Sequence, residues 1–143
     1  MNENGKNAIL IVDDETSNIA GLTRILRPEY TVCAAKNGAA ALEAAEKFLP
    51  DVILLDIIMP EMDGYAVIAA LKRSEKTRHI PVIFITGLKG VEDEEKGLAL
   101  GAADYIPKPF RPATIKLRVQ NQMKMINQTR LIIEKEIDRK SVV

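Results

Sequence analysis

The segment VILLDIIMPEMDG, residues 52–64, decides the fold of this chain. It opens with four apolar residues and places Asp56 directly after them. A short, continuously apolar run of this kind is typical of a strand that is buried on both faces of a parallel sheet. Open α/β sheets bind their ligands at the carboxyl ends of such strands. We therefore expect Asp56 to lie at a ligand-binding edge.

Three other strand-like segments end in residues that can bind a metal ion or a phosphoryl group. These residues are Asp13 and Asp14 after segment 8–12, Thr86 at the end of segment 81–86, and Lys108 after segment 105–107. If the strands lie side by side and parallel, three carboxylates, a hydroxyl and an ammonium group converge on one edge. Clustered carboxylates repel one another, so this cluster would need a cation. Ligands that are all oxygen atoms point to Mg²⁺.

Strand-like and helix-like segments alternate five times along the chain. This alternation predicts an α/β fold in which helices cover both faces of a parallel sheet. The predicted strands are residues 8–12, 30–35, 52–56, 81–86 and 105–107. The predicted helices begin near Thr16, which we expect to be a cap, and then at residues 39, 65, 92 and 112. Asp63-Gly64 is interpreted as an ordinary turn.

The residue types at this edge suit the transfer of a phosphoryl group to a carboxylate. A carboxylate oxygen can attack phosphorus and form an acyl phosphate. A metal ion and one fixed cation would neutralise the phosphoryl oxygens during in-line transfer. Lys108 can be this cation, because Pro107 and Pro109 restrict the backbone on both sides of it. Thr86 can donate a hydrogen bond to the same group.

Taken together, these motifs resemble the receiver domain of bacterial two-component response regulators. The motifs are Asp13-Asp14, Asp56 with Met59-Pro60 and Asp63-Gly64, Thr86-Gly87, and the segment from Gly101 to Phe110 that contains Lys108. The resemblance covers about residues 7–124. It implies a flavodoxin-like (βα)5 fold, in which a doubly wound parallel sheet has the strand order 2-1-3-4-5.

The resemblance also implies a metal-dependent phosphorylation site. Asp56 would accept the phosphoryl group from the histidine of a sensor kinase. Asp14 and Asp56 would ligate Mg²⁺ directly, together with the backbone carbonyl of Ile58, whereas Asp13 would act largely through water. The chain would catalyse its own phosphotransfer and autodephosphorylation, but it would serve mainly as a signalling switch.

The same resemblance assigns roles to three residues around the phosphoryl group. Lys108 would contact the phosphoryl group, and Thr86 and Tyr105 would form a switch pair. On phosphorylation, Thr86 would move towards the phosphoryl oxygens and Tyr105 would turn inward. The implied partners are a sensor histidine kinase and a downstream effector domain or protein.

Other functions are less consistent with these residues. Asp13 and Asp14 alone could simply cap a helix. A Mg²⁺-dependent phosphatase with an aspartate nucleophile needs a second acid two residues later, where this chain has Ile58. A nucleotide-binding domain would have a Gly-rich or Ser/Thr-rich loop after the first strand. A receiver without chemistry, acting only by binding, would not need to keep all the site residues. A stand-alone regulator that acts through protein–protein contacts remains an alternative.

The composition is that of an ordinary soluble domain. The 143 residues are 47% hydrophobic and 28% charged, enough for one core. No apolar run approaches the roughly 20 residues of a membrane span, and no signal-peptide pattern is present. The single cysteine, Cys33, has no partner, so the expected location is the cytoplasm. Basic residues after residue 110 lack interleaved aromatics, which favours a solvated helix face over direct nucleic-acid binding.

We expect residues 1–124 to form the receiver domain and residues 125–143 a helical extension towards an effector or a dimer partner. Apolar residues continue at alternating spacings of four and three, as in a coiled-coil seam. The predicted seam is Val119, Met123, Ile126, Arg130, Ile133 and Ile137. A homodimer would also use the face of the fourth helix, fifth strand and fifth helix. On that face Leu117 should be exposed, and the resemblance places Asp104 and Arg118 where related regulators form salt bridges between subunits.

Overall fold

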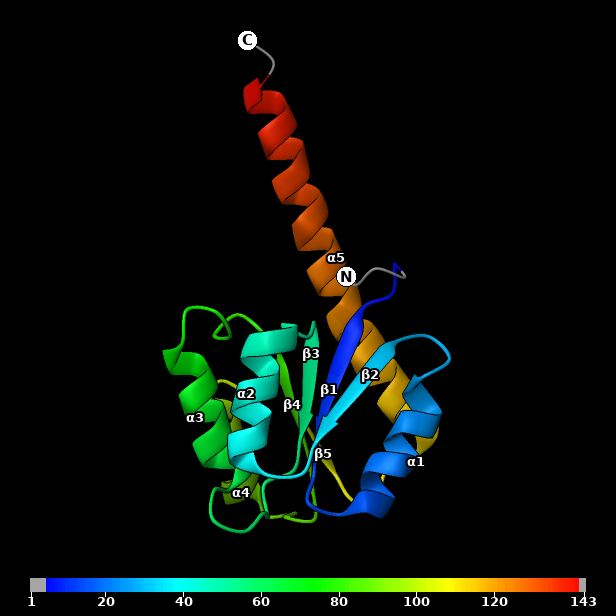
Figure 1. Cartoon of the computed structure of the whole chain (residues 1–143), viewed down its shortest axis with the longest axis vertical. Coiled ribbons are helices and arrows are strands. Elements are labelled where there is room, and N and C mark those ends of the chain that lie inside the picture. Colours follow the sequence, from blue (N-terminus) through cyan, green and yellow to red (C-terminus); the bar gives the residue numbers. More distant parts are fainter. Residues whose placement is uncertain (1–4, 142–143) are drawn as a thin grey trace.

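Five parallel strands form one sheet in the order β2-β1-β3-β4-β5, and helices cover both of its faces (Figure 1). This computed structural model describes residues 5–141. The predicted fold class and strand order are confirmed. The elements are β1 (Ala8–Val12), α1 (Thr16–Leu26), β2 (Thr31–Ala35), α2 (Gly38–Phe48), β3 (Val52–Leu55), α3 (Gly64–Arg73), β4 (Val82–Thr86), α4 (Val91–Ala99), β5 (Asp104–Pro107) and α5 (Pro112–Ser141).

The sheet separates two apolar layers. Alternate residues of β1 point to opposite faces, so Leu10 packs against α2 and α3, whereas Ile9 packs against α1 and α5. Both β3 and β4 are buried along their whole length. This burial explains why their sequences read as continuous apolar runs rather than as alternating ones.

The helix caps differ in part from the predictions. Asp63 is more than a turn residue, because its side chain accepts a hydrogen bond from the Ala66 backbone N–H and caps α3. The prediction that Thr16 caps the first helix is wrong. Glu15 holds the N-cap position of α1, and its side chain makes no capping hydrogen bond. Most other element boundaries lie within one residue of the predicted ones.

The last helix serves two different purposes along its length. Ile115, Val119 and Met123 are buried in the core, and Ile126 packs at its edge. The helix then continues well beyond the rest of the molecule, away from the carboxyl ends of the strands (Figure 1). The prediction of one continuous partner-binding seam is therefore wrong in its first half, because those side chains already pack on their own domain.

Arg130 also belongs to the domain rather than to a free seam. Its guanidinium forms a salt bridge with Asp51, a residue that is 5% exposed at the start of β3. Asp51 also accepts a hydrogen bond from the Ala8 backbone N–H at 2.7 Å. Contacts between α5 and the sheet thus extend to Arg130, whereas the domain boundary at residue 124 stays a prediction.

Two further expectations concern the outer face of α5. Leu117 is 58% exposed, as predicted. Asp104 and Arg118 form a salt bridge with each other within the chain, with an N–O distance of 2.6 Å. Within residues 5–141, no helix is both long enough and apolar enough to cross a membrane.

Candidate functional site

Side chains from four strand ends meet at the carboxyl edge of the sheet. Asp13 follows β1, Asp56 follows β3, Thr86 ends β4, and Lys108 follows β5. The first three residues are 2%, 6% and 0% exposed, so this edge is a recess that is largely shielded from solvent. Parallel strands bring these residues together because all of their carboxyl ends lie on the same side.

Lys108 joins two of the carboxylates. Its ammonium nitrogen lies 2.9 Å from Asp13 Oδ2 and 3.3 Å from Asp56 Oδ2. The other carboxylate oxygens accept backbone hydrogen bonds, Asp13 Oδ1 from Glu15 and Asp56 Oδ1 from Ile57. The Lys108 backbone N–H donates a hydrogen bond of 2.8 Å to the Thr86 carbonyl. This bond fixes the backbone of Lys108 directly after β5. The structure therefore brings together the predicted phosphoacceptor and its predicted cationic partner.

The charges at this edge are not fully compensated. Burial raises the pKa of Asp56, and the nearby Asp13 carboxylate adds to the effect, although Lys108 opposes it. Burial alone would lower the pKa of Lys108, but its hydrogen bond with Asp13 and the charge of Asp56 raise it instead. The site holds more negative than positive charge, which favours the binding of a cation.

The three aspartates are arranged as a set of metal ligands. One carboxylate oxygen from each of Asp13, Asp14 and Asp56 lies within 4.8 Å of the others. Asp14 is exposed, whereas the other two are buried, so the set opens to solvent on one side. This oxygen-only donor set fits a hard divalent cation such as Mg²⁺. Ile58, which lies in the loop after β3, is 57% exposed.

The predicted switch residues are linked through Leu88. The Leu88 backbone N–H donates to Thr86 Oγ1 at 3.3 Å, and its carbonyl accepts from the Tyr105 hydroxyl at 2.8 Å. Tyr105 is 7% exposed, and burial is the main reason that its pKa is raised to about 12. Tyr105 therefore already lies inward in this structure. Its predicted inward movement would start from a more outward position than the one observed.

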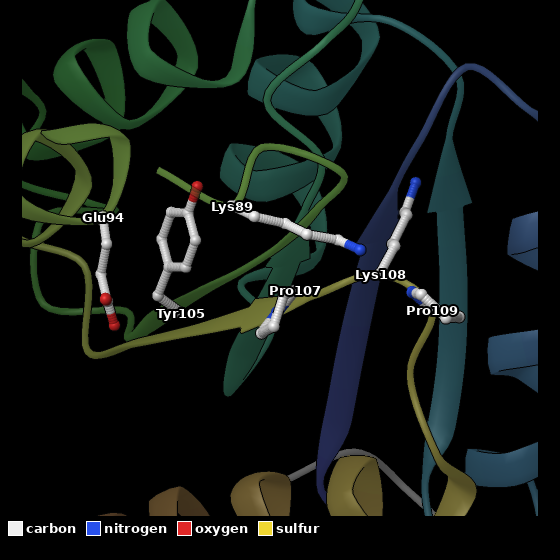
Figure 2. Close-up of a pocket in the computed structure, with 6 residues that line it drawn as sticks. All are labelled: Lys89, Glu94, Tyr105, Pro107, Lys108 and Pro109. Carbon is white, nitrogen blue, oxygen red and sulfur yellow. The ribbon is translucent and has the colours of Figure 1, made fainter. Parts of the chain in front are cut away.

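A hollow next to Lys108 connects the site with α4. Figure 2 shows its lining residues, which are Lys89, Glu94, Tyr105, Pro107, Lys108 and Pro109. The Lys89 side chain extends towards Lys108, and the Tyr105 ring stands between Lys89 and Glu94 (Figure 2). Tyr105, the predicted switch residue, thus lies beside the same opening as Lys108.

The sequence interpretation missed the role of Gly64. Its backbone N–H donates to the Ile57 carbonyl at 2.8 Å. A Cβ atom at this position would lie 2.3 Å from the Asp56 carbonyl oxygen, so only glycine permits this approach. The only signal in the sequence is a glycine directly after the capping residue Asp63, and such a pair is equally typical of a surface turn.

Comparison with known proteins agrees with this geometry. The family model of the response regulator receiver domain matches residues 9–120, which is most of the chain. The chain belongs to this family. The five-stranded fold and the acidic recess at the carboxyl edge are thus those of a receiver domain that acts as a phosphoacceptor switch in two-component response regulators.

Two curated proteins illustrate the similarity. A probable cyclic di-GMP phosphodiesterase of Vibrio cholerae is 47% identical over 115 residues, which are 80% of this chain and 26% of that protein. The response regulator PleD of Caulobacter vibrioides is 45% identical over 114 residues, which are 79% of this chain and 25% of PleD. This receiver therefore spans about a quarter of the length of these two relatives.

A solved structure supports the fold independently. The chemotaxis protein CheY4 of Vibrio cholerae superimposes with a TM-score of 0.78 at 30% sequence identity. The superposition covers 82% of this chain and 98% of CheY4.

Proposed function

We propose that this receiver accepts a phosphoryl group on Asp56 in a Mg²⁺-dependent reaction and thereby switches an output surface. The observation that carries the proposal is the position of Asp56. It is a buried carboxylate whose Oδ2 faces Lys108, next to two further aspartates that could hold a cation. A single lysine does not offset three neighbouring aspartates, so stability alone does not explain the cluster, because like charges in a buried site oppose folding.

The transfer needs no proton from the protein. An Asp56 oxygen attacks phosphorus, and the bond from phosphorus to the nitrogen of a kinase phosphohistidine breaks. The electron pair leaves with the donor imidazole, which departs neutral when its other nitrogen already carries a proton. Lys108 offsets the charge of the phosphoryl oxygens, and the Thr86 hydroxyl donates to one of them.

The aspartates would hold the metal ion. Asp14, Asp56 and the Ile58 carbonyl would ligate Mg²⁺ directly. Asp13 would act largely through a water molecule. When bound, Mg²⁺ would neutralise part of the carboxylate charge and of the incoming phosphoryl charge. The proposed phosphoryl donor is a sensor histidine kinase, and the proposed location of the reaction is the cytoplasm.

Acetyl phosphate can test the acceptor directly. The parent should gain one phosphoryl group in intact mass spectra only when Mg²⁺ is present, and Asp56→Asn should gain none. Asp63→Asn is the matched control, because it removes the same charge from an exposed residue of the same loop and asparagine can still cap α3. Phosphorylation of the Asp56→Asn variant at the parent rate would refute the assignment.

The output is proposed to pass through Thr86 and Tyr105 to the surface of α4, β5 and α5. Thr86→Ala should still accept phosphate from acetyl phosphate but should lose the phosphate-dependent change in partner binding. Among the similar proteins are a probable cyclic di-GMP phosphodiesterase and, at 40% identity, probable transcriptional regulators of algal species, so an effector reached through α5 is the favoured output. A stand-alone regulator that acts through protein–protein contacts is the second candidate, since the chemotaxis protein CheY4 has a similar fold.

A further inference from the structure

Helix α4 is poorly anchored by apolar contacts. Gly97 is its one buried residue, although it has no side chain to pack. The apolar residues Val91 and Leu98 point outward and are 69% and 45% exposed. A helix on the surface of a sheet normally packs an apolar stripe against it. Leu88 before the helix and Leu100 at its C-cap pack against the core, but the helix itself needs further contacts to hold it in place.

Two tyrosine hydroxyls provide these contacts. The Tyr65 hydroxyl donates to the Asp93 carbonyl near the start of α4 at 3.1 Å. The Tyr105 hydroxyl donates to the Leu88 carbonyl in the loop that leads into α4. The Lys96 ammonium of α4 also lies over the Tyr65 ring, 4.3 Å from its centroid. Tyr65 thus contacts α4 at two places.

Tyr65 is also connected to the backbone of Asp56. It directly follows Gly64, which packs against the Asp56 carbonyl and donates to the Ile57 carbonyl. The Ile57 N–H in turn donates to Asp56 Oδ1, the carboxylate of the proposed phosphoacceptor. A change at this carboxylate can therefore reach Tyr65 through two hydrogen bonds and one tight backbone contact.

The two tyrosines share one aromatic neighbour. The Phe84 ring of β4 lies edge-on to Tyr65 and to Tyr105, with centroid distances of 5.8 and 6.1 Å. Gly97 lets α4 come close to this ring, because a Cβ there would lie 3.0 Å from Phe84. The three rings form a rigid layer beneath α4.

We propose that Tyr65 is a second positioning residue of the switch, which couples Asp56 to α4 through the start of α3. This route is separate from the one through Thr86, Leu88 and Tyr105. The coupling rests on the proposed phosphorylation of Asp56, whereas the attachment of α4 by Tyr65 does not. The consequence is that α4 responds to the site from two directions, through the loop before α3 and through the loop after β4.

Hydrogen exchange of the unmodified protein tests the attachment. Tyr65→Phe keeps the ring but removes the hydroxyl that donates to Asp93. Amides of residues 91–97 should then exchange about two- to tenfold faster, as expected for the loss of one hydrogen bond. Tyr30→Phe is the matched control, since it removes a hydroxyl from a half-buried tyrosine on the other side of the sheet. Unchanged α4 exchange in Tyr65→Phe, with a native circular dichroism spectrum, would overturn the proposal.

Beryllofluoride with Mg²⁺ tests the coupling. Bound beryllofluoride, followed by ¹⁹F NMR, should be equal in the parent, Tyr65→Phe and Tyr105→Phe. The beryllofluoride-induced change in α4 exchange should be reduced by about half or more in each single variant and abolished in the double variant. A full response in Tyr65→Phe would overturn the second route. Failure of the parent to bind beryllofluoride would instead refute the phosphorylation of Asp56 and would leave the resting-state test of the attachment valid.

Discussion

At the scale of single residues, Asp56 lies where its own charge is unfavourable. Burial and the Asp13 carboxylate raise its pKa, and the contact with Lys108 compensates only in part. An incoming cation would reduce this unfavourable interaction. The burial that distinguishes the proposed phosphoacceptor therefore costs the resting domain stability.

Asp56→Asn should stabilise the domain without Mg²⁺ at neutral pH, because it removes a charge that burial disfavours. Because the folded-state pKa of Asp56 is raised above its unfolded value, the penalty is absent at low pH and grows as the pH rises through the folded pKa. Urea unfolding at several pH values measures the difference. Equal or lower stability of the variant at neutral pH would contradict the prediction.

The lifetime of the phosphorylated state should depend on two apolar residues. Ile58 lies two residues after Asp56, and Leu88 two residues after Thr86. Neither side chain can hydrogen-bond a water molecule aligned for attack on the phosphoryl group. Ile58→Asn combined with Leu88→Asn should accelerate phosphate loss on the order of tenfold, the effect of about 1.4 kcal/mol of transition-state stabilisation.

Decay of the phosphorylated mass after removal of acetyl phosphate, with Mg²⁺ kept present, measures this rate. Leu117→Asn is the control, since Leu117 is 58% exposed, close to the 57% of Ile58, but lies on α5. A double variant that loses phosphate no faster than the parent would show that water access through these positions does not limit hydrolysis.

At the scale of elements, the start of α3 positions the phosphoacceptor loop. Asp63 caps the helix, and Gly64 brings its first turn against the Asp56 carbonyl. The same turn carries Tyr65 to α4. One helix terminus thus contacts the Asp56 backbone and, through Tyr65, the helix α4 of the proposed output surface.

Gly64→Ala should destabilise the domain by about 1–3 kcal/mol, because the added methyl group would overlap backbone atoms that cannot move freely. It should also slow phosphorylation by acetyl phosphate. Gly21→Ala in α1 is the control, since no atom lies within 4 Å of the added Cβ. That variant should be neutral or more stable by about 0.5–1 kcal/mol, because alanine favours helix. Similar behaviour of the two variants in urea unfolding would contradict the steric argument.

At the scale of the whole molecule, α5 connects the sheet with a surface far from Asp56. Its first half belongs to the core, and Arg130 ties its middle to Asp51 at the amino end of β3. Beyond Arg130 the apolar residues are exposed, with Ile133 at 53% and Ile137 at 60%. This outer part therefore offers an apolar surface to a partner.

We expect a homodimer that forms through the outer part of α5 and is tightened by beryllofluoride. Ile133→Asp combined with Ile137→Asp should abolish it, because both residues lie on one stripe of the helix. Leu131→Asp is the control, since it places a negative charge on a different face of the same helix. Light scattering gives the mass of each variant. A monomeric parent at high concentration, with and without beryllofluoride, would refute the dimer.

The sequence by itself determined the sheet, its strand order through the family resemblance, and the residues of the acidic recess. Each of these residues directly follows or ends an apolar strand, so a parallel sheet must place them on one edge. Local sequence is sufficient for such a site, because chain direction alone decides where the strand ends lie.

The tertiary structure decided the contacts between distant segments. Asp51 and Arg130 are 79 residues apart, and Tyr65 and Asp93 are 28 apart. No periodicity in the sequence pairs them, and an apolar stripe looks the same whether it faces its own domain or a partner. For this reason the sequence did not predict that the first half of the seam belongs to the core. The close approach of Gly64 to Asp56 likewise appears only in the tertiary structure, because the sequence there is that of an ordinary turn.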